Sequence, residues 1–491
     1  MKIMNTMKKI IGIFVLFALL TACEKELDIN TNPNTPTDVN KSLVLTAAQG
    51  SLVTGLGGQL TNLGGFLAQY HTQSPSASQY TNIDTYNMNT DYSNRLWNEL
   101  YAGCLNDLNY VIEKSIEDGD TGTLLIATLL RVYTFQVLTD LYGDIPYSEA
   151  LQGEDNITPN IDSGSDIYAG LISELNEAVS NYTSNPVQST VGVQDAIYGA
   201  NMSDWIKFAN TLKLKLYIRM SYTNMADAGQ VMALINEGNF ITSDTKFDLY
   251  EDAQNKANPF YDVQLDRLGD VNNVASSSLL EFLSENADPR LNVVFRRNDA
   301  NIFRGLDQGD RGSFASEVAA NFSRPNVTSE TPVYLMTVAE SKFLQAEAVI
   351  RYAGGVNAAQ LYNEGVENSF ITYGLSASDA QSLIGTGGIY EYVPSADIEE
   401  ALRQVMIQKW VSLAYVNNIE GFFESNRTHY PETVTIGSEN YAEGNLVVSV
   451  SSVLTGNQTP NTIFYPDTEV TKNPNITQKG SITEKIWWDQ K

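Results

Sequence analysis

Apolar residues recur at intervals of three and four along most of this chain, and this helical period constrains the fold more than any other feature. The pattern is clearest in residues 97–108 and 124–142, where the apolar positions share one face of a helix. It predicts further helices over residues 206–220, 231–235, 333–352, 358–370 and 398–416. Short breaks at residues 119–120, 224 and 354–355 divide these segments into consecutive pairs. Pairs of this length predict a mostly α fold built from tetratricopeptide-like helix pairs, although the consensus of that repeat is absent.

Long irregular stretches separate the helix pairs. They cover residues 69–90, 242–275, 299–331 and 429–467. Loops of this length inside a compact protein are usually either functional or disordered. Because these loops carry many aromatic residues, we expect them to be ordered and functional.

The first 22 residues have the features of a lipoprotein export signal. Lys8 and Lys9 precede a short apolar run, and Leu20-Thr21-Ala22-Cys23 resembles the bacterial lipobox, in which the Cys thiol is diacylated and becomes the first residue. The apolar run is shorter than the roughly 20 residues that a membrane-spanning helix needs. We therefore predict that residues 1–22 are removed, that Cys23 anchors the protein to a membrane, that residues 23–40 form a polar tether, and that residues 41–491 form one domain.

The tether begins with the acidic residues Glu24, Glu26 and Asp28 around Lys25. This stretch resembles the surface-export signal of Bacteroidetes lipoproteins, and a plain solvated tether explains it equally well. The whole chain has a net charge of -28, and removing Lys2, Lys8 and Lys9 with the signal makes it -31. So acidic a protein is repelled by phosphate backbones, which excludes nucleic acid as a partner. Highly anionic polymers are disfavoured as ligands too, unless the fold forms a local basic patch.

The residues give no support for catalysis. Only two histidines exist, His71 and His429, and no Gly-x-Ser-x-Gly elbow accompanies them. No zinc-type spacing and no phosphate loop are present, so we predict no enzyme, no metal and no cofactor. A carboxylate pair for glycoside hydrolysis is not ruled out by counting, since 58 acidic residues are present, but nothing marks any two of them. The second cysteine, Cys104, has no disulfide partner if Cys23 is acylated.

Ordered short motifs identify a resemblance to a known family. They are LTDLYGDIPYSEA at 138–150, ADPRL at 287–291, AESKFLQAEA at 339–348, ALRQVMIQKW from 401, NRTHYP at 426–431, FYPDTEVTKN at 464–473 and KIWWD at 485–489. In this order and after a lipobox, they resemble the SusD-like (SusD/RagB-type) nutrient-binding outer-membrane lipoproteins of Bacteroidetes over nearly the whole mature chain. Three departures concern packing motifs. Asn426 stands where the family often has Arg, His429 stands where it often has Gly, and residues 461–463 lack an Arg that is common just before the later Tyr-Pro.

The resemblance implies a fold, a function and partners. The implied fold is mostly helical, with four tetratricopeptide-like pairs supporting a loop-rich half that carries the ligand site. The implied function is that of a lid over a SusC-like TonB-dependent porin, which captures an oligosaccharide at the cell surface and delivers it into the barrel. The implied location is the outer membrane, with a lipid anchor and the body facing the cell exterior. An oligopeptide ligand of the same kind of lid is the alternative, and a purely structural surface protein is a third possibility that the long aromatic loops do not favour.

Aromatic side chains provide flat surfaces for sugar rings, and polar groups around them bind the hydroxyls. All five Trp residues fit packing roles in helices or in the C-terminal motif, so the ligand platform is expected from Tyr and Phe. The loop at 69–92 offers polar neighbours at Asn82, Asp84 and Asn87, and later loops add Asp262 and Phe314. The candidate ligand-binding residues are His71, Gln79, Tyr80, Tyr86, Tyr92, Phe260, Tyr261, Arg267, Phe303 and Arg304. We expect about half of them to be loop anchors packed against the scaffold and two or three to contact ligand.

Overall fold

The computed structural model describes residues 39–491, of which Lys41–Lys491 forms one compact unit. The predicted signal peptide, the lipidation of Cys23 and nearly all of the predicted tether lie outside the described residues.

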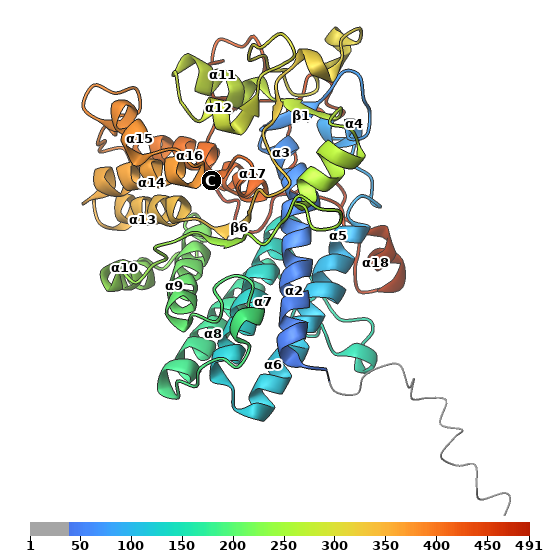
Figure 1. Cartoon of the computed structure of the whole chain (residues 1–491), viewed down its shortest axis with the longest axis vertical. Helices are drawn as coiled ribbons and strands as arrows, with labels where there is room; N and C mark the ends of the chain where they lie inside the picture. The colour runs from blue at the N-terminus through green and yellow to red at the C-terminus, as the bar shows by residue number, and fades with distance from the viewer. Residues whose placement is uncertain (1–38) are drawn as a thin grey trace, which may run out of the picture. The chain divides into compact units, whose positions relative to one another are not determined.

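Helices make up most of the described chain, and Figure 1 shows their arrangement. The longer ones are α2 (Lys41–Gly55), α6 (Asn106–Asp118), α7 (Thr121–Tyr142), α8 (Gly164–Ser184), α9 (Met202–Arg219), α10 (Ala228–Glu237), α11 (Ser277–Glu285), α13 (Val338–Tyr352), α14 (Ala358–Thr372), α15 (Ala377–Ile384), α16 (Ile398–Leu413) and α17 (Asn418–Thr428). The shorter ones are α3 (Thr61–Leu67), α4 (Thr81–Asp84), α5 (Asn94–Asn98), α12 (Leu291–Val294) and α18 (Asp467–Lys472). Consecutive helices pack in pairs, notably α6 with α7, α7 with α8, and α13 with α14, so the predicted mostly α architecture of paired helices is confirmed.

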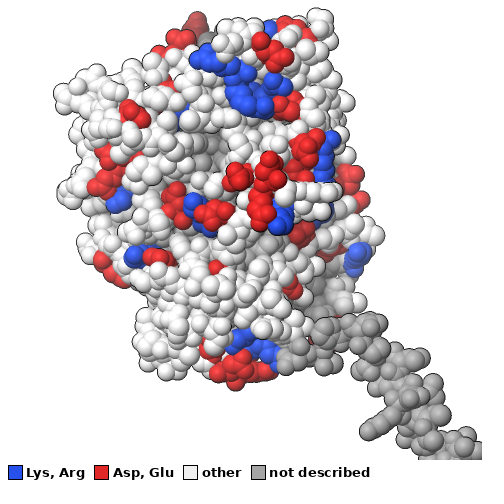
Figure 2. All heavy atoms as spheres, in the orientation of Figure 1, with Lys and Arg blue, Asp and Glu red and all other residues white. Residues whose placement is uncertain are grey.

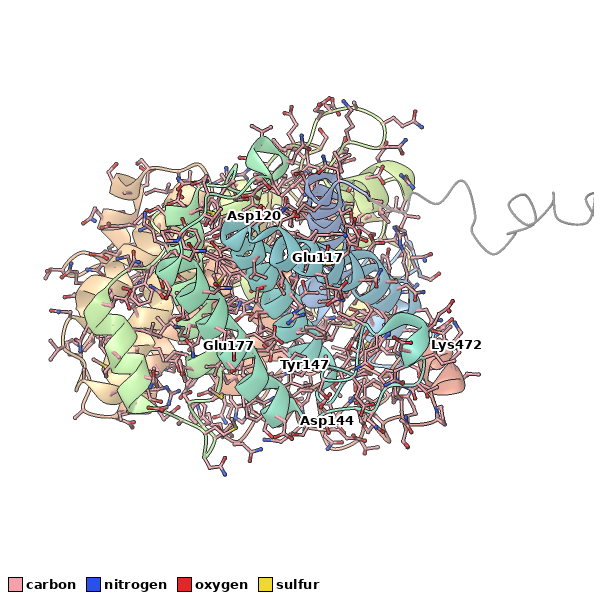
Figure 3. All side chains as sticks on the ribbon, turned by 90° about the horizontal axis from the view of Figure 1, so that it is seen from below. Glu117, Asp120, Asp144, Tyr147, Glu177 and Lys472 are labelled. Atoms are coloured by element: carbon pink, nitrogen blue, oxygen red, sulfur yellow. The ribbon has the colours of Figure 1, made fainter. Side chains whose placement is uncertain are left out.

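Local capping explains where the pairs turn. The Asp120 carboxylate accepts hydrogen bonds from the Thr123 backbone N–H at 2.9 Å and from its hydroxyl at 2.7 Å, which starts α7 directly after α6 ends. Figure 3 shows Glu117 of α6 and Asp120 close together at this turn, with Glu177 further along on α8. At the other end of α7, the Asp144 carboxylate accepts from the backbone N–H of Gly164 at 2.8 Å, and the Ser163 hydroxyl caps α8 by accepting from the Asp166 backbone N–H at 3.2 Å. These caps place three long helices side by side.

The helix α7 is the one helix of the described residues that is long and apolar enough to cross a membrane. Its most apolar stretch is 89% buried inside the fold, so it is a core helix of this domain. Continuous burial on all sides explains why its sequence is apolar around most of its circumference.

Strands are short and form four two-stranded sheets within residues 39–491. These pair β1 (His71–Gln73) with β3 (Asn273–Ala275), β2 (Thr245–Phe247) with β6 (Val333–Met336), β4 (Phe295–Arg296) with β5 (Arg324–Pro325), and β7 (Thr433–Val434) with β8 (Leu446–Val447). The first three sheets are antiparallel and the last is parallel. They lie within or beside the segments that were expected to be irregular loops, and Figure 1 shows β1, α4, α11 and α12 together at one end of the body.

One predicted helix boundary is wrong. Periodicity predicts a helix throughout residues 333–352, but the first four form β6, and the helix starts only at Val338. Thr337 marks the change, because its hydroxyl accepts from the Glu340 backbone N–H at 3.1 Å and caps α13. A short apolar run such as Val-Tyr-Leu-Met fits a buried strand as well as a buried helix.

A charged cluster lies in the buried centre, where α7, α9, α13, α16 and α17 meet. Its cations and anions balance within the described residues: Lys215, Arg219, Arg351, Lys409 and Arg427 face Asp140, Glu340, Glu347, Glu420 and Glu424. Arg427 donates to both Glu347 and Glu424, at 2.7 Å and 2.6 Å. Charges buried this deeply need complete pairing. The motifs at 339–348 and 401–410 contribute Glu340, Glu347 and Lys409 to this cluster.

Candidate functional site

Three separate parts of the chain meet at one pocket of about 200 Å³ in the described domain. Its lining residues are Thr54, Gly55, Gly58, Gln59, Asn62, Tyr80, Tyr92, Arg95, Leu96, Glu99, Pro259, Val263 and Gln264. They come from the first helices, from the first long loop and from the segment after Pro259.

The pocket is bordered by π-helical segments. The described residues contain three such segments, η1 (Leu56–Leu60), η2 (Glu99–Leu105) and η5 (Tyr261–Arg267), and all three supply lining residues. A π-helical turn is rare in proteins and occurs frequently at functional sites. The meeting of all three at one pocket is therefore evidence that this pocket has a function.

The pocket wall carries polar side chains that the protein leaves incompletely paired. Gln264 is 6% exposed, and its Nε2 donates to the Tyr80 hydroxyl at 2.7 Å, while its Oε1 is buried without a partner among the described residues. The Tyr92 hydroxyl lies beside the amides of Gln59 and Asn62 without a hydrogen bond of standard geometry. Burial raises the pKa of both tyrosines, so both are neutral phenols. An unpaired buried polar atom costs about 1–3 kcal/mol, which a ligand that supplies a partner would offset.

Two charged side chains also line the pocket. Arg95 is exposed and Glu99 is half-buried, four residues apart on the continuous helix formed by α5 and η2. Within the described part of the chain, neither forms a salt bridge, with the other or with any other residue. The pocket thus has one cation and one anion whose charges cancel, and each keeps its hydrogen-bonding capacity.

His71 lies behind this pocket and is a structural residue. It is fully buried, one ring nitrogen lies 3.1 Å from the Asn62 carbonyl oxygen, and the other lies 3.2 Å from the Tyr415 hydroxyl. Burial lowers the pKa of the imidazole to about 3, so the ring is neutral at physiological pH. Gly65 makes room for it, since a Cβ there would stand 2.0 Å from His71 Cε1.

Of the ten candidate residues, Tyr80 and Tyr92 line the pocket. His71, Tyr86 and Phe260 are buried, at 0%, 4% and 1% exposure, and present no face to a ligand. Their burial has a common cause, because an aromatic ring in a long loop gains most by anchoring that loop on the scaffold.

The other five candidates lie outside the pocket lining. Gln79 is exposed, and Tyr261 is half-buried beside η5 residues that do line the pocket. Arg267 pairs with Asp262 at 2.7 Å, and Arg304 pairs with Glu317. Phe303 lies under the guanidinium of Arg297, whose carbon is 4.2 Å from the ring centroid. Arg267, Phe303 and Arg304 thus contact other residues of the later loops.

Sequence reasoning missed six polar lining residues: Thr54, Gln59, Asn62, Arg95, Glu99 and Gln264. None belongs to a recognisable motif. Gly57 and Gly58 within η1 were the one local signal, because two glycines inside a helical stretch indicate close packing of backbone. A Cβ on Gly57 would stand 2.3 Å from a methyl carbon of Val333.

A wider cleft of about 540 Å³ lies between α11, α14, α16 and residues 389–395. The protein itself pairs several polar groups of that cleft. Gln404 exchanges hydrogen bonds with the backbone of Val393, and the Tyr390 hydroxyl donates to Asp288. None of the candidate residues lines it. The pocket at the π-helical segments is therefore the better candidate site.

Basic side chains gather at the loop-rich end of the body, as Figure 2 shows, with acidic side chains next to them. Arg296 and Arg324 share Asp270, and Arg324 also contacts Asp299. Carboxylates thus pair with these two arginines, whereas Arg297 and Arg311 contact only uncharged groups among the described residues. The positive charge of the later loops is therefore partly neutralised.

Comparisons with known proteins agree with this architecture. A family model named SusD-like_2, described as starch-binding and associating with the outer membrane, matches residues 33–449. The chain belongs to the SusD-like family. This confirms the resemblance inferred from the motifs, and SusD-like proteins are associated with the outer membrane. A search of curated proteins finds no significant match.

Solved structures of SusD homologues have the same fold. A SusD homologue from Bacteroides uniformis is 23% identical with a TM-score of 0.75, covering 91% of this chain and 99% of its own. A chitin-binding SusD homologue from Flavobacterium johnsoniae is 20% identical with a TM-score of 0.76, covering 92% and 99%. A SusD homologue from Bacteroides thetaiotaomicron is 22% identical with a TM-score of 0.73, covering 92% and 100%. At these identities the likeness establishes the fold.

Proposed function

We propose that this protein is a non-catalytic glycan-binding lipoprotein of the outer-membrane surface, and that it delivers its ligand to a SusC-like TonB-dependent transporter. The observation that carries the proposal is the pocket at η1, η2 and η5, where two tyrosines accompany incompletely paired amides. Membership of a family described as starch-binding and a structural neighbour described as chitin-binding both support a glycan ligand.

Ligand binding is tested with purified protein on a glycan array, followed by calorimetry with each glycan that binds. Tyr80→Ala is expected to weaken binding about 2- to 12-fold, because an aromatic contact adds about 0.5–1.5 kcal/mol beyond area burial. Gln79→Ala is the matched control, since Gln79 is the exposed neighbour outside the pocket. Equal affinity of both variants would place the ligand elsewhere, and cleavage of the glycan by purified protein would contradict a non-catalytic role.

The oligopeptide alternative is tested on the same protein with a library of short peptides. A peptide site commonly uses a strand edge for backbone pairing, and the residues that line the pocket belong to helices and loops. We therefore expect no peptide to compete with a bound glycan. Peptide binding that Tyr80→Ala abolishes would favour the alternative.

The anchor and the transporter partner are tested in cells. Cys23→Ala is expected to leave the protein unacylated and to release it from the outer membrane when the partner is absent. Wild-type protein extracted in mild detergent is expected to bring down a much larger outer-membrane protein at equal stoichiometry. Retention of the unacylated variant would contradict the anchor, and extraction of lone lipoprotein from cells that express the transporter would contradict delivery.

A further inference from the structure

We propose that the pocket holds a single uncharged sugar ring, recognised through its hydroxyl groups, rather than an acidic sugar or a long stretch of glycan. This inference rests on the proposed glycan-binding function and narrows its ligand. It depends on three independent features: the size of the pocket, the balance of its charges and the mixture of its donors and acceptors.

Size limits how much of a glycan can enter. Pockets for drug-sized ligands span roughly 300–1,000 Å³, and this pocket has about 200 Å³. It therefore encloses one ring of a longer ligand, with the rest of the chain outside. An extended platform would need exposed aromatic rings in a row, but four of the five Trp residues are at most 4% exposed and Trp487 packs against Tyr168.

The free polar groups are an even mixture of donors and acceptors. Acceptors are the Gln264 Oε1, the Glu99 carboxylate and the Oε1 of Gln59, whose Nε2 already donates to the Tyr92 carbonyl at 2.6 Å. Donors are the Arg95 guanidinium, the Tyr92 hydroxyl, which has no hydrogen-bond partner among the described residues, and the Tyr80 hydroxyl, whose oxygen already accepts from Gln264. A hydroxyl group both donates and accepts, so a ring with several hydroxyls can satisfy both kinds of group.

A carboxylate or sulfate on the ligand would not fit this mixture. Such a group only accepts hydrogen bonds, so at its own position it can use the donors but offers nothing to the three acceptors, which only the remaining hydroxyls of the ring can then satisfy. It would also be repelled by Glu99 and by the negative net charge of the whole chain. Arg95 and Glu99 together therefore favour a neutral ring.

The decisive experiment compares neutral and acidic sugars on purified wild-type protein by saturation-transfer NMR. The probes are glucose, galactose and mannose, each against its matching uronic acid, followed by calorimetry with a glycan that the array identifies as a ligand. We expect a neutral monosaccharide to compete with that glycan, and each uronic acid to compete at least about ten-fold less well. We also expect affinity to rise less than about ten-fold between a monosaccharide and its hexamer.

Gln264→Leu tests whether the sugar ring binds in this pocket. It removes both amide atoms at nearly constant size, and a neutral hydrogen bond is worth about 1 kcal/mol, so affinity should fall about five-fold. Gln404→Leu in the wider cleft is the matched control and should bind like wild type, with thermal melting used to confirm that both variants are folded. Tighter binding of a uronic acid, or a steep gain in affinity with chain length, overturns this inference while the proposed function stands. Binding of no glycan at all would contradict the proposed function itself.

Discussion

Replacing Asp84 with asparagine should stabilise this protein at neutral and alkaline pH. Asp84 is fully buried in the loop-rich half, and its Oδ1 accepts from the Thr72 hydroxyl at 2.7 Å, the Gln73 backbone N–H at 3.2 Å and the Gln308 amide at 2.7 Å. Its Oδ2 is buried without a hydrogen-bond partner among the described residues. Burial raises the pKa of this carboxyl to about 7, against an ordinary value of 3.8.

The raised pKa of Asp84 determines the sign and the size of the change in the free energy of unfolding. Between about pH 4 and pH 7 the folded protein holds a proton on Asp84 that the unfolded chain has released, so the free energy of unfolding falls as the pH rises through this window. A shift of about three pKa units corresponds to about 4 kcal/mol as an upper limit. An asparagine at this position would keep the Oδ1 acceptor and carry no charge, so Asp84→Asn should recover up to this amount at pH 8 and change stability little at pH 4.

Urea unfolding of wild type and Asp84→Asn at pH 4 and pH 8 measures the difference. Asp266→Asn is the control, because Asp266 is exposed and has no side-chain hydrogen bond within the described residues. The Asp84→Asn variant should gain stability relative to wild type only at the higher pH. If Asp84→Asn is less stable than wild type at pH 8, the buried carboxylate stabilises the fold as an anion, and the reasoning from desolvation is refuted.

Three further predictions concern the buried charged cluster and His71, which lies behind the pocket. Glu424→Gln removes a carboxylate that three buried cations share. It should therefore lower the free energy of unfolding, measured by urea denaturation, by about 3–5 kcal/mol. A loss below about 1 kcal/mol would contradict a stabilising role for Glu424 in this cluster. Gly65→Ala should displace His71 and lower the melting temperature, while Gly50→Ala, where a Cβ meets nothing within 4 Å, should not. The imidazole of His71 should show no titration by NMR between about pH 5 and pH 8, because burial lowers its pKa to about 3.

Much of the helical scaffold could be predicted from periodicity alone. The segments at 124–142, 358–370 and 398–416 correspond closely to α7, α14 and α16, because each buries one face, or in α7 nearly all of its surface. The prediction failed at β6, which pairs with β2 from a distant part of the chain. Periodicity reports local burial and carries no information on such long-range pairing.

The candidate site was only partly predictable for a related reason. Tyr80 and Tyr92 could be found by searching loops for aromatic rings, but the same search selected Tyr86 and Phe260, which the fold uses as anchors. Whether a loop ring packs inward depends on what lies beneath it, and that surface comes from distant segments. Gln264 reaches Tyr80 across 184 positions of sequence, and no local pattern indicates this.

The use of tryptophan connects the scaffold with the proposed mode of recognition. Trp205 donates to Asp195 and Trp488 to Asp140, while Trp410 donates to the Ala68 carbonyl, so these rings hold the scaffold together. With the Trp rings used for packing, the aromatic contacts available in the pocket are those of Tyr80 and Tyr92. Recognition then combines these two rings with hydrogen bonds to hydroxyl groups, which need precise spacing of donors and acceptors. Gln59, Glu99 and Gln264 each lie in a different π-helical segment, so all three of these segments contribute hydrogen-bonding groups to the one pocket.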